Sequence, residues 1–99
     1  MTQVYLGLGA NIEPQVSLQA GIAELRAVFG QVELSPVYLA PAVGMEGPDF
    51  LNMVVAFDCH MNHPQLMQWI RVTETRHGRQ RPVGSDNLPS SHGLDMDLL

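Results

Sequence analysis

Apolar and polar residues alternate along four stretches of this chain, at residues 3–9, 31–38, 50–58 and 94–99. Because successive side chains of a β-strand point to opposite faces, this alternation predicts four strands that each turn one face toward a core. The third stretch is apolar on both faces apart from Asn52 and the terminal Asp58. A buried amide without a hydrogen-bond partner is costly, so Asn52 is expected to be bonded, near the surface or available to a ligand.

Two other stretches carry apolar residues at the three- and four-residue spacing of an amphipathic helix. The first helix is predicted from Pro14 to Phe29 and the second over residues 64–77, starting at Pro64. The order strand, helix, strand, strand, helix, strand predicts an α+β, ferredoxin-like βαββαβ fold. Its four-stranded antiparallel sheet would carry both helices on one face, with the C-terminal strand in a central position.

Length and composition predict one compact domain over residues 1–99, of which 45% are hydrophobic and 15% are charged. No basic segment precedes an apolar stretch at the N-terminus, and the longest clean apolar run, residues 53–57, is far shorter than a membrane span. The single cysteine, Cys59, excludes an internal disulfide and favours a reducing compartment. We therefore expect a cytoplasmic protein without a membrane-spanning segment.

The formal net charge of −5 argues against general nucleic-acid binding, which depends on Lys and Arg contacts to phosphates. The chain has no lysine, and four of its five arginines lie within residues 71–81: Arg71, Arg76, Arg79 and Arg81. Guanidinium groups bind phosphate oxygens through paired hydrogen bonds, so this basic group is suited to a small polyanion. A solvated helix face is the alternative, and the sequence leaves both interpretations open.

The last predicted strand places two carboxylates, those of Asp95 and Asp97, on one face. Residues two apart in a strand are separated by roughly 6.6 Å, so these carboxylates can converge on a pair of divalent cations about 3.5 to 4 Å apart. A site for magnesium and phosphate is therefore one hypothesis for this strand. The alternative is that both acids are exposed on the solvent side of an edge strand.

Five segments of the chain, in the same order, carry a resemblance to a known family. They are Tyr5-Leu6-Gly7-Leu8-Gly9-Ala10-Asn11, Ser35-Pro36-Val37-Tyr38, Pro48-Asp49-Phe50-Leu51-Asn52, Glu74 followed by Gly78-Arg79 and Arg81, and Leu94-Asp95-Met96-Asp97. Together they resemble the 6-hydroxymethyl-7,8-dihydropterin pyrophosphokinases of folate biosynthesis over essentially the whole chain. The resemblance implies a ferredoxin-like core, in agreement with the order of elements, and an enzyme that transfers diphosphate from ATP to the pterin.

The resemblance also implies a role for individual residues. Asp95 and Asp97 would hold two Mg²⁺ ions between the triphosphate and the acceptor hydroxyl, and Arg79 and Arg81 would act with them in catalysis. The residues that would bind the pterin are Ala40, Pro41, Val43, Phe50 and Asn52. Those that would lie near the nucleotide are Met67, Arg71, Glu74, Arg79, Arg81 and His92.

The chain departs from the family pattern at several positions. The usual serine of the first motif is Ala10, a Thr or Ser is Ala40, a Tyr is Phe50, and an Arg-Thr pair is His92-Gly93. The loss of arginine matters most, because histidine is neutral for much of the time near pH 7 whereas arginine is always charged. Longer family members also continue past the Asp-x-Asp strand, so we expect a fragment, a truncated product or a degenerate relative in which transfer is reduced.

The alternative hypothesis is a non-catalytic ferredoxin-like module that binds a pterin or another small molecule. An RNA-binding version would need exposed aromatic and basic residues along the third strand, a pattern that residues 50–55 do not show. Release of AMP from ATP and the pterin in the presence of Mg²⁺ distinguishes the enzyme from the binding module.

Overall fold

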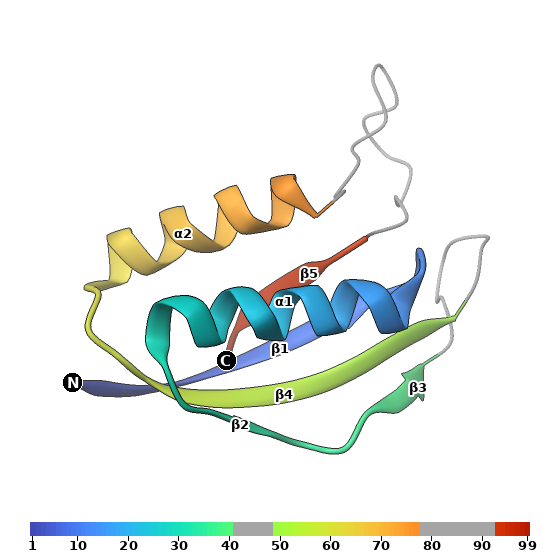
Figure 1. Cartoon of the computed structure of the whole chain (residues 1–99), viewed down its shortest axis with the longest axis horizontal. Coiled ribbons are helices and arrows are strands. Elements are labelled where there is room, and N and C mark those ends of the chain that lie inside the picture. Colours follow the sequence, from blue (N-terminus) through green and yellow to red (C-terminus); the bar gives the residue numbers. More distant parts are fainter. Residues whose placement is uncertain (41–48, 78–92) are drawn as a thin grey trace.

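The computed structural model describes residues 1–40, 49–77 and 93–99. Their elements are β1 (Thr2–Ala10), α1 (Pro14–Phe29), β2 (Val32–Leu34), β3 (Tyr38–Ala40), β4 (Phe50–Cys59), α2 (His63–Arg76) and β5 (Asp95–Leu98). All these strands belong to one antiparallel sheet (Figure 1). The predicted α+β class and ferredoxin-like arrangement are therefore confirmed. In the described part of the chain, neither helix is long and apolar enough to cross a membrane.

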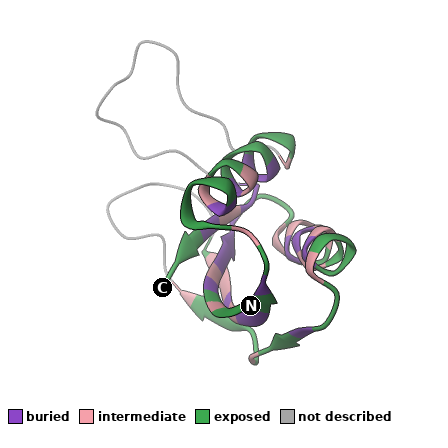
Figure 2. Ribbon diagram, turned by 90° about the vertical axis from the view of Figure 1, so that its left-hand side faces the viewer, coloured by how far each residue is buried: buried purple, intermediate pink, exposed green. Residues whose placement is uncertain are grey.

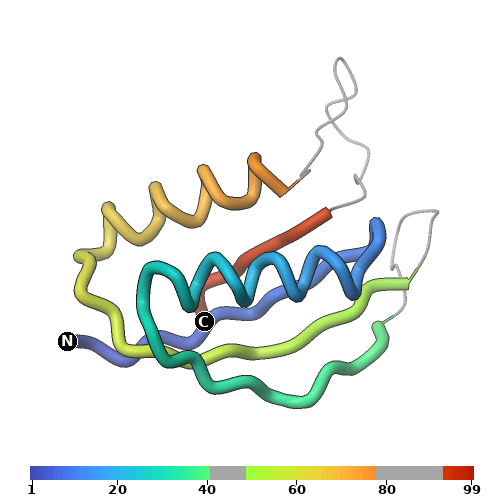
Figure 3. Tube along the Cα trace, viewed as in Figure 1, coloured from blue at the N-terminus to red at the C-terminus, as the bar shows by residue number. Residues whose placement is uncertain are grey.

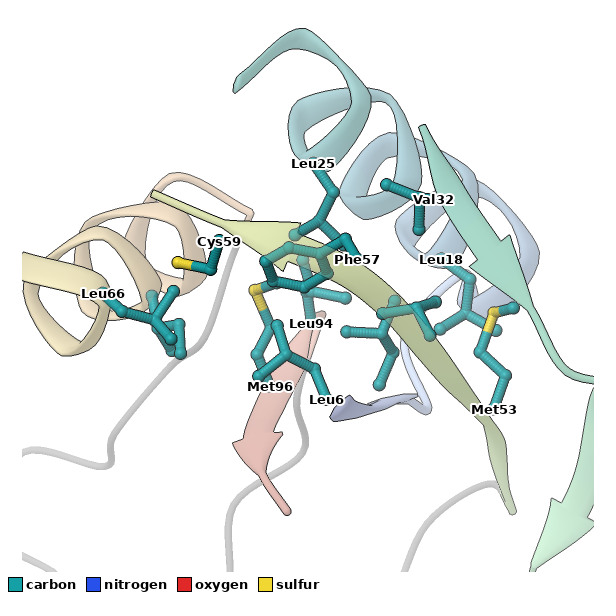
Figure 4. Close-up of a cluster of buried hydrophobic side chains, with 13 residues drawn as sticks. Leu6, Leu18, Leu25, Val32, Met53, Phe57, Cys59, Leu66, Leu94 and Met96 are labelled. Carbon is teal, nitrogen blue, oxygen red and sulfur yellow. The ribbon is translucent and has the colours of Figure 1, made fainter. Parts of the chain in front are cut away.

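Both helices cover the same face of the sheet, and the core lies between the helices and the sheet. Figure 2 shows the buried sides of the helices turned toward the strands. Alternate residues of β1 and β4, such as Leu6 and Phe57, point into this layer. The buried cluster consists of Leu6, Leu8, Leu18, Leu25, Val32, Met53, Val55, Phe57, Cys59, Leu66, Ile70, Leu94 and Met96 (Figure 4). The opposite face of the sheet carries the alternate residues of the strands, among them Asn52 and Asp95.

The strand predicted over residues 31–38 contains β2 and only the first residue of β3, Tyr38, and both of these short strands pair with β4. Between them, the Ser35 hydroxyl accepts a hydrogen bond from the Val54 N–H at 2.8 Å. The Ser35 N–H donates to the Val54 carbonyl at 2.9 Å. The next residue, Pro36, has no N–H to continue the ladder. Within residues 1–40, 49–77 and 93–99 the sheet therefore has five strands, and the predicted number of four is wrong.

The C-terminal strand β5 lies at an edge of the described sheet, whose order is β2-β4-β1-β5. The predicted central position is therefore wrong. One side of β5 pairs with β1, and its other side is next to α2 (Figure 1). Leu94, just before β5, is fully buried and lies so close to α1 that a Cβ on Gly21 would be 3.0 Å from its side chain. Packing against both helices thus helps to hold β5, which has one neighbouring strand, β1, in the described part of the chain.

The second helix begins one residue earlier than predicted, because Asn62 caps it. The Asn62 side chain accepts a hydrogen bond from the Gln65 N–H, and the Gln65 side chain accepts one from the Asn62 N–H, both at 2.9 Å.

The Asn62→Ala variant is expected to lose about 1 kcal/mol in the free energy of unfolding, because a helix N–H is left without its acceptor. Chemical denaturation measures this loss. The control is Gln68→Ala, an exposed position of the same helix, and an equal loss there would contradict the capping role.

Candidate functional site

One row of residues crosses three strands on the sheet face turned away from the helices. Asn52 of β4 is paired with Gly9 of β1, and Gly9 is paired with Asp95 of β5. The adjacent residues Leu8 and Met96 are buried in the core, so the row itself faces the other way. Neighbouring strands are about 4.8 Å apart, which separates the Asn52 and Asp95 backbones by about 10 Å. The only residue between them in this row is a glycine, which has no side chain to divide the surface.

Asp95 and Asp97 share this face, as the alternating pattern predicted. Asp95 is half-buried and Asp97 is exposed, whereas Met96 between them is buried. The described ranges contain no group of three or more His, Cys, Asp and Glu side chains arranged to hold a metal ion. Mg²⁺ prefers oxygen ligands, and in nucleotide sites it is usually bound by one or two carboxylates together with substrate phosphates. The donor atoms of Asp95 and Asp97 fit an ion that is shared with a phosphate ligand.

A pocket of about 500 Å³ lies between α2 and β5. Its lining residues are Met67, Ile70, Arg71, Glu74, Thr75, Met96 and Asp97. Three residues that the resemblance assigns to the nucleotide, Met67, Arg71 and Glu74, therefore lie around one pocket with the predicted metal ligand Asp97. The volume falls within the range of about 300 to 1,000 Å³ that is typical of small-molecule sites. The pocket is thus large enough for part of a nucleotide.

Glu74 is buried in the wall of this pocket, with 4% of its surface exposed. Its carboxylate oxygen Oε2 accepts a hydrogen bond from the backbone N–H of Met96 at 2.9 Å. N–H groups point alternately to the two sides of a strand, and that of Met96 points to the edge of the described sheet. Glu74 therefore supplies the acceptor that another strand would provide. This contact ties α2 to the backbone between Asp95 and Asp97.

The two described arginines of the basic group have different surroundings. Arg71 lines the pocket, whereas Arg76 forms an ion pair with Glu24 of α1 at 3.4 Å. The same Glu24 oxygen lies 3.1 Å from Nε2 of His77. The Arg76 side chain is 57% exposed, so this pair adds little to stability. Of these two arginines, Arg71 is placed to meet a ligand in the pocket.

The described residues that the resemblance assigns to the pterin gather at one end of the sheet. Ala40 of β3 is paired with Phe50 of β4, and Asn52 follows Phe50 on the same face. All three residues are half-buried. Figure 3 shows the end of β3, the start of β4 and the start of β5 at the same end of the molecule. The other residues that the resemblance assigns to the pterin or to the nucleotide lie outside the described part of the chain. They are Pro41, Val43, Arg79, Arg81 and His92.

Comparison with known sequences assigns the chain to a family. The sequence model described as 7,8-dihydro-6-hydroxymethylpterin-pyrophosphokinase (HPPK) matches residues 5–99. The chain belongs to the HPPK family.

Two relatives of this HPPK-family chain carry the name 2-amino-4-hydroxy-6-hydroxymethyldihydropteridine pyrophosphokinase. The protein from Synechocystis sp. is 39% identical over 79 residues, which cover 77% of this chain and 40% of the relative. The protein from Pseudomonas aeruginosa is 30% identical over 101 aligned positions, which cover 98% of this chain and 60% of the relative. The HPPK-family chain therefore spans 40 to 60% of the length of these relatives.

Two features of this HPPK-family chain were missed in the sequence. The first is the contact of Glu74 with β5. The sequence does indicate that Glu74 is buried, because it follows Leu66 and Ile70 at four-residue intervals on the buried side of α2. A carboxylate at such a position needs a hydrogen-bond partner. The place of Gly9 between Asn52 and Asp95 has no such signal, since strand register cannot be deduced from these positions alone.

Proposed function

We propose that this chain transfers a diphosphate group from ATP to 6-hydroxymethyl-7,8-dihydropterin, the activity for which its relatives are named. The hydroxymethyl oxygen of the pterin attacks the β-phosphorus of ATP. The bond between that phosphorus and the oxygen shared with the α-phosphate breaks, and AMP leaves with this oxygen. The hydroxyl proton is released. Such chemistry depends mainly on positioning and on neutralising phosphate charge.

The observation that carries this proposal is the pocket in which Met67, Arg71 and Glu74 meet Asp97. Asp95 lies on the same face as Asp97 and in the same row as Asn52. A pair of ligands that extends from the pocket to Asn52 therefore passes the two carboxylates. This arrangement supports transfer between two bound substrates, because the reacting groups must be held close together.

Each residue has a role in this proposal. Asp95 and Asp97 would hold Mg²⁺, as a pair of ions, and the metal would supply charge neutralisation for the triphosphate. The side chain of Asn52 hydrogen-bonds the polar edge of the pterin, and Phe50 stacks on its ring. Backbone groups of Ala40, Pro41 and Val43 complete the pterin pocket. The nucleotide is bound by Met67, Arg71 and Glu74, with Arg79, Arg81 and His92 acting on its phosphates.

Incubation of the purified chain with ATP, the dihydropterin and Mg²⁺ tests the proposed function. Chromatography should detect AMP and the pterin diphosphate in equal amounts, and neither product should form when the metal is chelated. Pterin binding without AMP would instead support the non-catalytic binding module. That module is favoured by His92, which stands where the family pattern has a permanently charged arginine.

The Asn52→Ala variant is expected to weaken binding of the dihydropterin by about 1 to 3 kcal/mol, because it leaves hydrogen-bonding groups of the ligand unpaired. Binding of ATP should change little, since Asn52 lies outside the pocket between α2 and β5. Titration calorimetry with each ligand measures both effects. Phe50→Ala should also weaken pterin binding through lost stacking. An equal loss for ATP and the pterin would mean that Asn52 has a structural role instead.

A further inference from the structure

We propose that Gly9 is a positioning residue that determines where the amide of Asn52 lies, and hence how the pterin is bound. The inference rests on the proposed function only in so far as Asn52 binds the pterin. Gly9 itself contributes no side chain to the site. Its contribution is the space directly above the backbone of β1, into which the Asn52 side chain extends.

The evidence is the close approach of two side chains to Gly9. A Cβ built on Gly9 would lie 2.8 Å from Oδ1 of Asn52 and 3.8 Å from Cδ1 of Phe50. The first distance is shorter than real Cβ atoms show, so no larger residue fits while the amide keeps this position. The second shows that the Phe50 ring borders the same space. Both side chains assigned to the pterin therefore meet above Gly9.

Space, and not backbone conformation, is the reason for glycine at this position. Among the described glycines, the one with a positive φ is Gly30. The backbone of Gly9 is therefore one that alanine can also adopt. β1 is paired with β4 on one side and with β5 on the other. An added methyl group would therefore displace the end of the Asn52 side chain more easily than either strand.

Gly7 provides a matched comparison on the same face of the same strand. A Cβ on Gly7 would lie 3.7 Å from the Leu99 side chain and 3.9 Å from the Asp97 carbonyl oxygen, which are ordinary van der Waals distances. Gly7 and Gly9 share the strand and the pairing with β4 and β5. They differ in the atoms that an added methyl group would contact. Gly7→Ala therefore measures any general effect of alanine on β1, and Gly9→Ala adds the effect on Asn52.

The test compares the variants Gly9→Ala, Gly7→Ala, Asn52→Ala and the double variant Gly9→Ala/Asn52→Ala. Binding of the dihydropterin should weaken about ten- to hundredfold in Gly9→Ala, and by less than about twofold in Gly7→Ala. The double variant should bind no more weakly than Asn52→Ala, because the effect of Gly9 acts through the amide. Similar losses in Gly7→Ala and Gly9→Ala, or additive losses in the double variant, would overturn the proposal.

A second readout does not depend on pterin binding. The side-chain NH₂ signals of Asn52 in an amide nitrogen–proton spectrum, identified by their absence in Asn52→Ala, should shift in Gly9→Ala and stay in place in Gly7→Ala. If the unmodified chain does not bind the pterin, this spectrum still decides the position of the amide. Unshifted signals in Gly9→Ala would overturn the proposal. If Gly9→Ala fails to fold, recovery of folding in the double variant supports the clash with Asn52, and failure of both variants refutes it.

Discussion

The Asp97→Asn variant is expected to lower the rate of Mg²⁺-dependent diphosphate transfer by about a thousandfold or more. A bound metal ion stabilises the charge of a phosphoryl transition state by several kcal/mol, and each 1.36 kcal/mol corresponds to about tenfold in rate. An amide oxygen is a weaker ligand for Mg²⁺ than a carboxylate, so most of this stabilisation should disappear. Asp97 is exposed, and its replacement should leave the fold unchanged. Asp95→Asn should have a comparable effect.

Release of AMP at increasing Mg²⁺ concentration measures this effect. Asp58→Asn is a suitable control, because Asp58 is an exposed aspartate of β4 that is paired with Gln3 near the start of β1. Its replacement changes the net charge by the same amount without touching the acidic pair. Transfer by Asp97→Asn at the rate of the control, with the same dependence on Mg²⁺, would rule out the proposed metal site.

The Glu74→Ala variant is expected to lower the free energy of unfolding by about 3 kcal/mol, which for a domain of this size lowers the Tm by more than about 10 °C. An unsatisfied buried N–H costs about 1 to 3 kcal/mol, and loss of the buried methylene adds about 0.8 kcal/mol. The N–H that would lose its partner is that of Met96, which donates a hydrogen bond to the Glu74 carboxylate at 2.9 Å. Diphosphate transfer should fall as well, because the backbone between Asp95 and Asp97 loses its contact with α2.

Glu74→Gln is the matched variant, since its side-chain carbonyl oxygen can still accept the Met96 N–H. It should lose less than about 1 kcal/mol, within the range of one neutral hydrogen bond. Thermal unfolding of the three proteins, followed by circular dichroism, gives the comparison. If the alanine and glutamine variants have the same Tm, the acceptor oxygen is not what stabilises β5. If Gln retains stability and loses ATP binding, the carboxylate also has the nucleotide role that the family resemblance implies.

Much of the local structure could be predicted, because periodicity depends on each segment alone. The spacing of apolar residues predicted α1 with the bounds that are observed, Pro14–Phe29. Alternation placed Asp95 and Asp97 on one face, since every strand turns alternate residues to the same side. Residues 31–38 were predicted as one strand, whereas the division into β2 and β3 depends on how each pairs with β4. The residue pattern thus determined which segments are helices and strands, and which side chains share a face.

Tertiary structure decided which of these faces and residues become neighbours. The edge position of β5 follows from its pairing with β1 and its packing beside α2, neither of which is visible in the Asp-x-Asp pattern. The pairing of Asn52 with Gly9, and of Gly9 with Asp95, joins positions far apart in the chain. Strand register is selected by how whole faces pack together, so no single segment contains it. The partner of Glu74 was likewise decided by tertiary structure. Its position on α2 indicates that it is buried, but the packing of α2 beside β5 brings its carboxylate to the Met96 N–H.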